Sequence, residues 1–225
     1  MIAIQKFTMA APQSPTDALR IQNEMRDLVS LIDDFPPVQT IVGIDVGYDI
    51  QRNMSKAALV VMNIDDFKVI QQIVEFDSTP FPYIPGLLSF REAPVILKAL
   101  ARLEKTPDIV FIDGQGIAHP RRLGIAAHVG VITNLPTIGV AKSLLCGQYK
   151  EPALKKGGAE PLTHKDERIG TVLRSRDNVK PLFISPGHKI SHESAVALVE
   201  KCLTKYRLPE PTRMADKLSK IKSGT

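Results

Sequence analysis

The chain is poor in cysteine, with two in 225 residues, and it contains no tryptophan. Cys146 and Cys202 have no CxxC spacing and no companion cluster of ligands, which excludes a disulfide framework and a structural zinc site. No apolar run approaches the roughly 18 residues that a membrane span requires, and the N-terminus has no basic start followed by an apolar stretch. We therefore expect a cytoplasmic protein with no membrane partner.

Charge is distributed unevenly along a chain whose hydrophobic content, 44%, is enough for one compact domain over residues 1–225. Between residues 142 and 180, nine Lys/Arg outnumber five Asp/Glu, a net of +4, and this leaves about +1 of the total +5 for the other residues. A local excess of this kind is typical of a face that binds a polyanion. A solvated lysine-rich loop would give the same pattern.

Apolar periodicity predicts three strands followed by alternating helices and strands. The three strands, which we expect to form an antiparallel meander, lie at 40–48, 56–64 and 69–76. A helix, a strand, a helix and a strand follow, at 89–103, 108–114, 122–132 and 137–145. This order predicts an α/β protein with a central mixed five-stranded sheet, flanked by helices on both faces.

The remaining elements lie before and after this central block. An amphipathic helix is expected at 14–34, and two short strands, a helix and a last short helix are expected at 169–174, 181–185, 191–206 and 209–222. The polar segment 147–168 reads as either a functional loop or a mobile one.

Four acidic residues are candidates for one shared site. Asp45 lies inside an apolar strand, where a carboxylate needs a partner or a cation, and Asp113 follows the strand DIVFIDG, at the edge where α/β sheets place their chemistry. Glu92 and Asp216 could join them from helices. Each of the last three has an ordinary alternative: Glu92 could complete a capping box with Ser89, Asp113 could serve a turn, and Asp216 could be an exposed helix residue.

Several carboxylates around one point make an oxygen-rich site, which suits Mg²⁺ or Mn²⁺ and lacks the His/Cys pattern that favours zinc. Combined with a basic face, this indicates metal-assisted hydrolysis of a phosphodiester. Covalent catalysis is not indicated, because Ser143, Ser185 and Cys146 have no local pattern that would supply a base.

The stretch 82-PYIPGLLSFRE-92 places two prolines, a tyrosine and a glycine ahead of an acidic residue at an expected helix start. Proline fixes φ and glycine opens φ space, so this loop is stiff except at one permissive point. A loop of this kind presents something.

The motifs, taken together, resemble the endonuclease V (deoxyinosine 3′ endonuclease) family along nearly the whole chain. The resemblance rests on six stretches in order: GIDVGYD, PYIPGLLSFRE, FIDGQGIAHPRRLGIAAHVG, LPTIGVAKSLL, ISPGHKIS and LPEPTRMAD. It implies an RNase H-like fold and Mg²⁺-dependent hydrolysis, with Mn²⁺ as a substitute, of the second phosphodiester 3′ to deoxyinosine and other deaminated bases in DNA. The products would be a 3′-hydroxyl and a 5′-phosphate.

The resemblance also implies roles for individual residues. The metal ligands would be Asp45, Glu92 and Asp113, with Asp216 as an additional catalytic acid. Other roles fall on His119, which would contact substrate near the cleavage site, and on Lys142, which would approach a phosphate. The wedge that replaces a displaced base would be Tyr83, in the loop formed by Pro82, Tyr83, Ile84 and Pro85. The pocket for the flipped base would be lined by Gly86, Leu88, Gly114 and Ile125, with main-chain groups at Gly86, Gly114 and Gly116 reading hypoxanthine.

Two further segments match the family less informatively. His188 in SPGHKIS is interpreted as structural, in a turn before a helix. The segment 149–165 is assigned only nonspecific contact with phosphate.

Two other functions remain open at this point. An endoribonuclease specific for inosine in RNA would use the same chemistry, and the sequence does not show which residue reads a 2′-hydroxyl. A catalytically silent RNase H-like binding module would be expected to lack at least one acid, whereas Asp45, Glu92 and Asp113 are all present. No heptad seam demands a dimer, so we expect a monomer.

Overall fold

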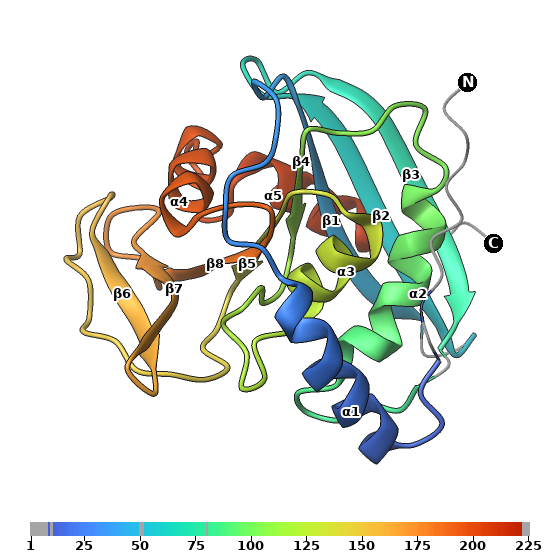
Figure 1. The fold of residues 1–225 in the computed structure, drawn as a ribbon. Coiled ribbons are helices and arrows are strands. Elements are labelled where there is room, and N and C mark those ends of the chain that lie inside the picture. Colours follow the sequence, from blue (N-terminus) through green and yellow to red (C-terminus); the bar gives the residue numbers. More distant parts are fainter. Residues whose placement is uncertain (1–8, 10, 50–51, 80, 222–225) are drawn as a thin grey trace.

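The computed structural model describes residue 9 and residues 11–49, 52–79 and 81–221. Its centre is one mixed sheet with the strand order β3-β2-β1-β4-β5-β8-β7-β6 (Figure 1). The strands are β1 (Thr40–Asp49), β2 (Met54–Asn63), β3 (Val69–Ser78), β4 (Ile109–Ile112), β5 (Thr137–Ala141), β6 (Ala159–His164), β7 (Glu167–Leu173) and β8 (Leu182–His188). The helices are α1 (Pro15–Met25), α2 (Leu88–Leu100), α3 (Ile125–Thr133), α4 (His192–Lys201) and α5 (Glu210–Ser219), with a 3-10 turn at Arg26–Leu28.

The predicted meander and the two strands after it are confirmed. β1 pairs antiparallel with β2 and parallel with β4, and β4 pairs parallel with β5. The expected number of five strands was too low, because β8, β7 and β6 extend the sheet antiparallel beyond β5. β6 lies within the segment 147–168, which was expected to be a loop. It is an edge strand, AEPLTH, in which polar residues interrupt the apolar ones and a proline lies inside, so it carries no apolar run that would mark it.

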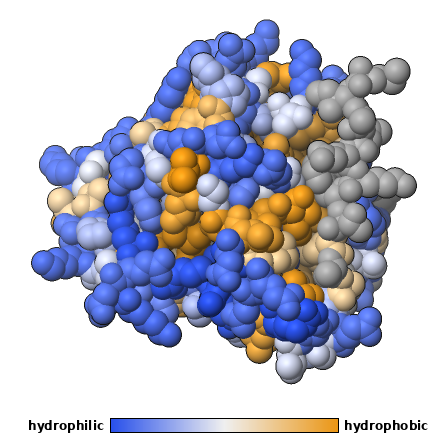
Figure 2. Space-filling view, viewed as in Figure 1, coloured by the Kyte–Doolittle hydropathy of each residue, from blue (hydrophilic) through white to orange (hydrophobic). Residues whose placement is uncertain are grey.

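Two apolar cores cover the two faces of the sheet, as the alternation of side chains along a strand requires. Ile41, Val60 and Phe111 belong to the core that includes Ala195 of α4 and Ala215 of α5. Val42 and Leu59, each next to one of these in sequence, belong to the core that includes Ile96 of α2 and Val129 of α3. Apolar side chains gather in the middle of the face around α3, with hydrophilic ones around them (Figure 2).

Three local expectations were wrong. The first helix ends at Met25 and a 3-10 turn follows it, so it does not continue to residue 34. The capping box fails because α2 begins one residue earlier, at Leu88, and its N-cap, Leu87, makes no side-chain cap. The sequence SPGH was expected to form a turn, but it is the end of strand β8. The His188 ring there accepts a hydrogen bond from the Ser30 N–H at 3.2 Å, which is a structural contact.

None of the helices in the described part of the chain is long and apolar enough to cross a bilayer.

Close packing of α5 on β1 depends on Gly43. A Cβ at this position would lie 1.9 Å from the carbonyl oxygen of Pro211, in the first turn of α5. Backbone at that distance cannot be relieved by rotating a side chain, so any larger residue would push α5 away from the sheet. Gly43 lies two residues before Asp45, and α5 carries Asp216, so this contact sets how near the two acids lie.

We predict that Gly43→Ala lowers the free energy of unfolding by about 1–3 kcal/mol, the usual cost of overpacking. The measurement is urea unfolding. Gly47→Ala is the matched control in the same strand, because its Cβ would lie 3.5 Å from the carbonyl oxygen of Ser219, an ordinary contact. Equal losses in the two variants would contradict the close-packing account.

Candidate active site

Asp45 and Asp113 lie side by side on neighbouring parallel strands. The register pairs Ile44 of β1 with Ile112 of β4, so the residue after each of them is an aspartate at the same level of the sheet. The Asp113 N–H donates to the Ile44 carbonyl at 2.9 Å, which continues the pairing by one residue. The expectation that the two strands are neighbours and bring these acids together is confirmed.

Asp216 joins the pair from α5. One ligand oxygen from each of Asp45, Asp113 and Asp216 lies within 4.8 Å of the others. The side chain of Asp216 is 18% exposed, so the alternative of an ordinary exposed helix residue does not hold. The grouping therefore contains a helix residue more than 100 positions away from its partners in the sequence.

Basic and hydroxyl groups hold this acidic cluster together. The Lys142 ammonium pairs with both Asp113 and Asp216, at 2.7 Å from the latter, and Lys220 pairs with Asp216 at 2.6 Å. The hydroxyl of Ser219 donates to Asp45. Burial disfavours the charge on Lys142, but its contacts with Asp113 and Asp216 outweigh this and raise the pKa of Lys142 above its usual value. Lys142 is thus a fixed positive charge among the acids.

The pKa values of Glu92 and Asp113 are raised chiefly by burial, to which the neighbouring acids add. Burial, with the charges of Asp45 and Asp113, raises the pKa of the Glu92 carboxyl to about 8. Burial also raises the pKa of Asp113 to about 6, although Lys142 opposes the shift. Glu92 lies on α2, close enough for the charges of Asp45 and Asp113 to raise its pKa. It is not one of the three acids whose oxygens lie within 4.8 Å of one another. Its role as a metal ligand remains a prediction.

The donor set fits a hard divalent cation. All the clustered ligand atoms are carboxylate oxygens, which Mg²⁺ and Mn²⁺ prefer. Asp113 Oδ2 is buried and has an ion pair with Lys142 but no hydrogen bond of good geometry in the described structure. A cation here would favour the charged forms of Glu92 and Asp113, which the protein alone disfavours.

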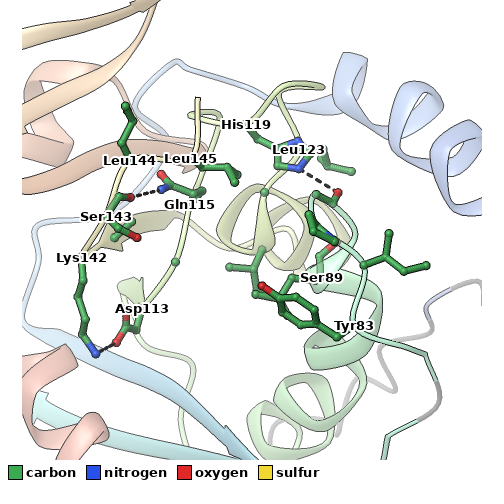
Figure 3. Close-up of a pocket in the computed structure, with 18 residues that line it drawn as sticks. Tyr83, Ser89, Asp113, Gln115, His119, Leu123, Lys142, Ser143, Leu144 and Leu145 are labelled. Atoms are coloured by element: carbon green, nitrogen blue, oxygen red, sulfur yellow. Dashed lines mark hydrogen bonds and ion pairs between the residues drawn. The ribbon is translucent and has the colours of Figure 1, made fainter. Parts of the chain in front are cut away.

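A cavity of about 380 Å³ opens beside the acids. Asp113 and Lys142 lie on one side of it and Tyr83 lies on the other (Figure 3). Of the predicted substrate-binding residues, seven line it: Tyr83, Ile84, Pro85, Gly86, Leu88, Gly114 and Ile125. Pro82 and Gly116 are not among the lining residues; a Cβ on Gly116 would lie 2.0 Å from the Pro186 carbonyl oxygen, so this glycine permits close packing against β8.

Three donors converge on one carbonyl of the tyrosine loop. The Gly86 oxygen accepts hydrogen bonds from Arg121 Nη2 at 2.7 Å, from Gln22 Nε2 at 3.0 Å and from His119 Nε2 at 3.0 Å. Gly86 has φ +78, a backbone conformation that residues with a side chain rarely adopt, so glycine is favoured here. The Tyr83 side chain is 69% exposed while the loop beneath it is fixed. The predicted stiff loop that presents a side chain is therefore present.

His119 lines the cavity, yet both of its ring nitrogens contact protein groups. Nε2 donates to Gly86, and Nδ1 accepts from the Arg121 N–H at 3.2 Å. Burial lowers the pKa of His119 to about 4, so the ring is neutral near pH 7. This geometry makes His119 a brace of the loop, and its predicted contact with substrate remains a prediction.

Sequence reasoning assigned no site role to eight lining residues: Ser89, Gln115, Leu123, Gly124, Ala141, Ser143, Leu144 and Leu145. The Gln115 side-chain amide donates to the Ser143 carbonyl at 3.0 Å, and its buried Oε1 has no partner among the described residues. Leu144 and Leu145 are exposed apolar side chains at the cavity mouth, opposite Tyr83 (Figure 3). Both leucines follow the VAKS motif directly. A pair of apolar residues beside the motif lysine was the signal by which the sequence could have indicated them.

The sheet, the clustered acids at the ends of adjacent strands and the cavity beside them are those of a nuclease with an RNase H-like fold. The comparisons with known proteins agree, since the family model described as Endonuclease V matches residues 23–217. The chain belongs to the endonuclease V family.

Relatives support this over nearly the full chain. Endonuclease V of Nostoc sp. is 52% identical over 209 residues, which are 92% of this chain and 95% of that protein. The crystal structure of the Streptomyces avermitilis enzyme has a TM-score of 0.89 at 40% identity and covers 93% of each chain. Ciona intestinalis endonuclease V, solved with a 24mer DNA containing an inosine followed by a ribo-adenosine, has a TM-score of 0.79 at 31% identity and covers 91% of this chain and 95% of its own.

We predict that stability without divalent cations falls as the pH rises from about 4.5 to about 8. The folded protein holds the Glu92 proton up to a pKa of about 8, whereas the reference value is 4.5, so over this range the unfolded chain has lost a proton that the folded one keeps. The contribution is fully present below the lower pKa and is lost through the upper one. Glu92→Gln should make the thermal midpoint, measured in chelator across this range, depend less on pH.

Glu104→Gln is the control, because it makes the same chemical change at an exposed glutamate. An unchanged pH slope in Glu92→Gln would show that Glu92 is not held protonated by its neighbours.

Proposed function

We propose that this chain is an endonuclease that recognises deoxyinosine, and less readily other deaminated bases, in DNA. It hydrolyses the second phosphodiester on the 3′ side and leaves a 3′-hydroxyl and a 5′-phosphate. The observation that carries the proposal is the cavity itself, which has Asp113 of the acidic cluster on one side and, on the other, the exposed Tyr83 of the braced loop. The Ciona intestinalis relative was solved with inosine-containing DNA, which supports the choice of base.

The acidic cluster would hold the cation. Asp45, Asp113 and Asp216, with Glu92, are the residues that would bind Mg²⁺, or Mn²⁺ in its place. Bound there, the cation supplies Lewis-acid activation of water and neutralises charge on the leaving oxygen. Lys142 contributes a positive charge that can approach a phosphate, since it borders both the acids and the cavity.

The loop residues would displace and hold the base. Tyr83 would enter the duplex where the base leaves, and Ile84, Pro85, Gly86 and Leu88 would line the space that receives it, with Gly114 and Ile125 opposite. Unstacking costs a few kcal/mol per step, and a loop already fixed at Gly86 loses little conformational entropy in meeting that cost. Main-chain groups near Gly86 and Gly114 can approach the base closely.

Inosine-specific cleavage of RNA is the second candidate function. It rests on the Ciona intestinalis complex, in which the inosine is followed by a ribo-adenosine. The 2′-hydroxyl distinguishes the two substrates, and the test must therefore include both sugars.

The proposal is tested by nicking of matched duplexes that carry one deoxyinosine or one riboinosine, with Mg²⁺, with Ca²⁺ and with chelator. We expect a Mg²⁺-dependent nick at the second phosphodiester 3′ to deoxyinosine. Asp45→Asn should lower the rate more than about 100-fold, since it removes a ligand and not merely an outer contact, while Asp65→Asn, an exposed acid on another surface, should leave it unchanged. Cleavage confined to the ribo substrate would establish the second candidate, and cleavage in chelator would contradict the cation site.

Tyr83→Ala should weaken binding to a deoxyinosine duplex about 10-fold, by loss of stacking, and binding to a plain duplex much less. The measurement is the equilibrium dissociation constant of each duplex in Ca²⁺. Tyr206→Ala, which removes a tyrosine 41% exposed and outside the cavity, is the matched control. Equal losses on both duplexes would count against a wedge.

A further inference from the structure

A buried histidine lies directly behind the cavity and contacts one of its lining residues. His128 of α3 is 0% exposed, and its Nδ1 is 3.0 Å from the hydroxyl oxygen of Ser89 on α2. Ser89 is 3% exposed and lines the cavity on the same side as Tyr83 (Figure 3). The other nitrogen of His128, Nε2, has no hydrogen-bond partner in the described part of the chain, and the ring stacks edge-on against Phe90.

This environment determines which nitrogen of His128 carries the proton. Burial lowers the pKa of His128 to about 4, so near neutral pH the ring has a single N–H. A proton on Nε2 would be a buried donor without an acceptor, whereas a bare Nε2 is only an acceptor left unused, which native structures tolerate better. The proton therefore belongs on Nδ1, which donates to Ser89.

The hydroxyl of Ser89 is then left with a proton to donate. Its oxygen accepts from His128, and a serine in a helix often donates to the carbonyl four residues earlier, which here is that of Pro85. No such bond is formed among the described residues, where the contact with His128 is the one side-chain hydrogen bond of Ser89. The cavity is the side of Ser89 that is open to a ligand.

We propose that Ser89, oriented by His128, is a specificity-determining residue that donates a hydrogen bond to an acceptor on the base in the cavity. The proposal deepens the proposed function and rests on it. Hypoxanthine offers two acceptors on one edge, O6 and N7, and adenine carries an amino donor in place of O6. A hydroxyl whose oxygen already accepts from His128 is set to give a proton. A bond to O6 favours the oxo base over adenine, whereas a bond to N7 selects a purine.

The test compares three duplexes with the wild type and two variants, in Ca²⁺ so that binding is measured without cleavage. The central base is deoxyinosine, deoxynebularine, which lacks O6 and with it the N1–H, or 7-deazadeoxyinosine, which lacks N7. The variants are Ser89→Ala, which leaves a buried His128 donor unpaired, and Ser89→Ala with His128→Leu, which removes both polar groups. The dissociation constants and the thermal midpoints are measured for each protein.

The wild type should bind one of the two analogues about 10-fold more weakly than deoxyinosine, and the part of that difference that Ser89→Ala removes identifies the acceptor that Ser89 reads. Ser89→Ala should lose that preference and also some stability. The double variant should recover the wild-type thermal midpoint, because no donor is left unpaired, and still lack the preference. A role confined to packing would restore stability and preference together.

Two results would overturn the proposal. One is a wild type that binds deoxyinosine tightly but discriminates against neither analogue, and the other is a full preference retained in either variant. A wild type that binds deoxyinosine no better than a plain duplex would instead contradict the proposed function, so the two failures are distinguishable.

Discussion

Repulsion between carboxylates on neighbouring strands is the constraint on which the site depends. Parallel pairing of β1 and β4 forces Asp45 and Asp113 to the same level of the sheet, and α5 adds Asp216. The protein alone offsets this charge with the Lys142 and Lys220 ammonium groups and by holding a proton on Glu92. Clustered carboxylates lower the stability of the folded chain. Proteins keep such unfavourable clusters at functional sites, and a cluster of carboxylates is typical of a site that binds a cation.

The loop that carries Tyr83 exposes an aromatic side chain on a backbone that is held in place. Three donors from α1 and from the segment after β4 meet at the Gly86 carbonyl, and Gln22 also donates to the Leu123 carbonyl at 3.3 Å. The buried Gln22 thereby ties the first helix to the loop and to the entrance of α3. The cavity and the acids are thus held by the same elements, with Asp113 and Gly114 next to each other in the chain.

Much of this could be predicted from the sequence because it is local or periodic. The meander, the buried strand before Asp113 and the stiff PYIPG loop each have a signal within a few residues. What could not be predicted depends on distant contacts: Asp216 reaches the acids because Gly43 lets Pro211 approach β1, and Ser89 meets His128 across two helices. The edge strand β6 was missed because its polar side chains give no apolar pattern, and the capping box was wrong because the helix begins one residue before Ser89.

Binding of Mn²⁺ to the protein in the absence of nucleic acid, followed by electron paramagnetic resonance, tests the central claim most directly. The account predicts saturable binding that strengthens as the pH rises, because protons leave Glu92 and Asp113 when the cation binds, and that is lost in Asp113→Asn. Undiminished binding in Asp113→Asn, or no binding by the wild type at any pH up to about 8, would contradict the assignment of these acids to one cation site.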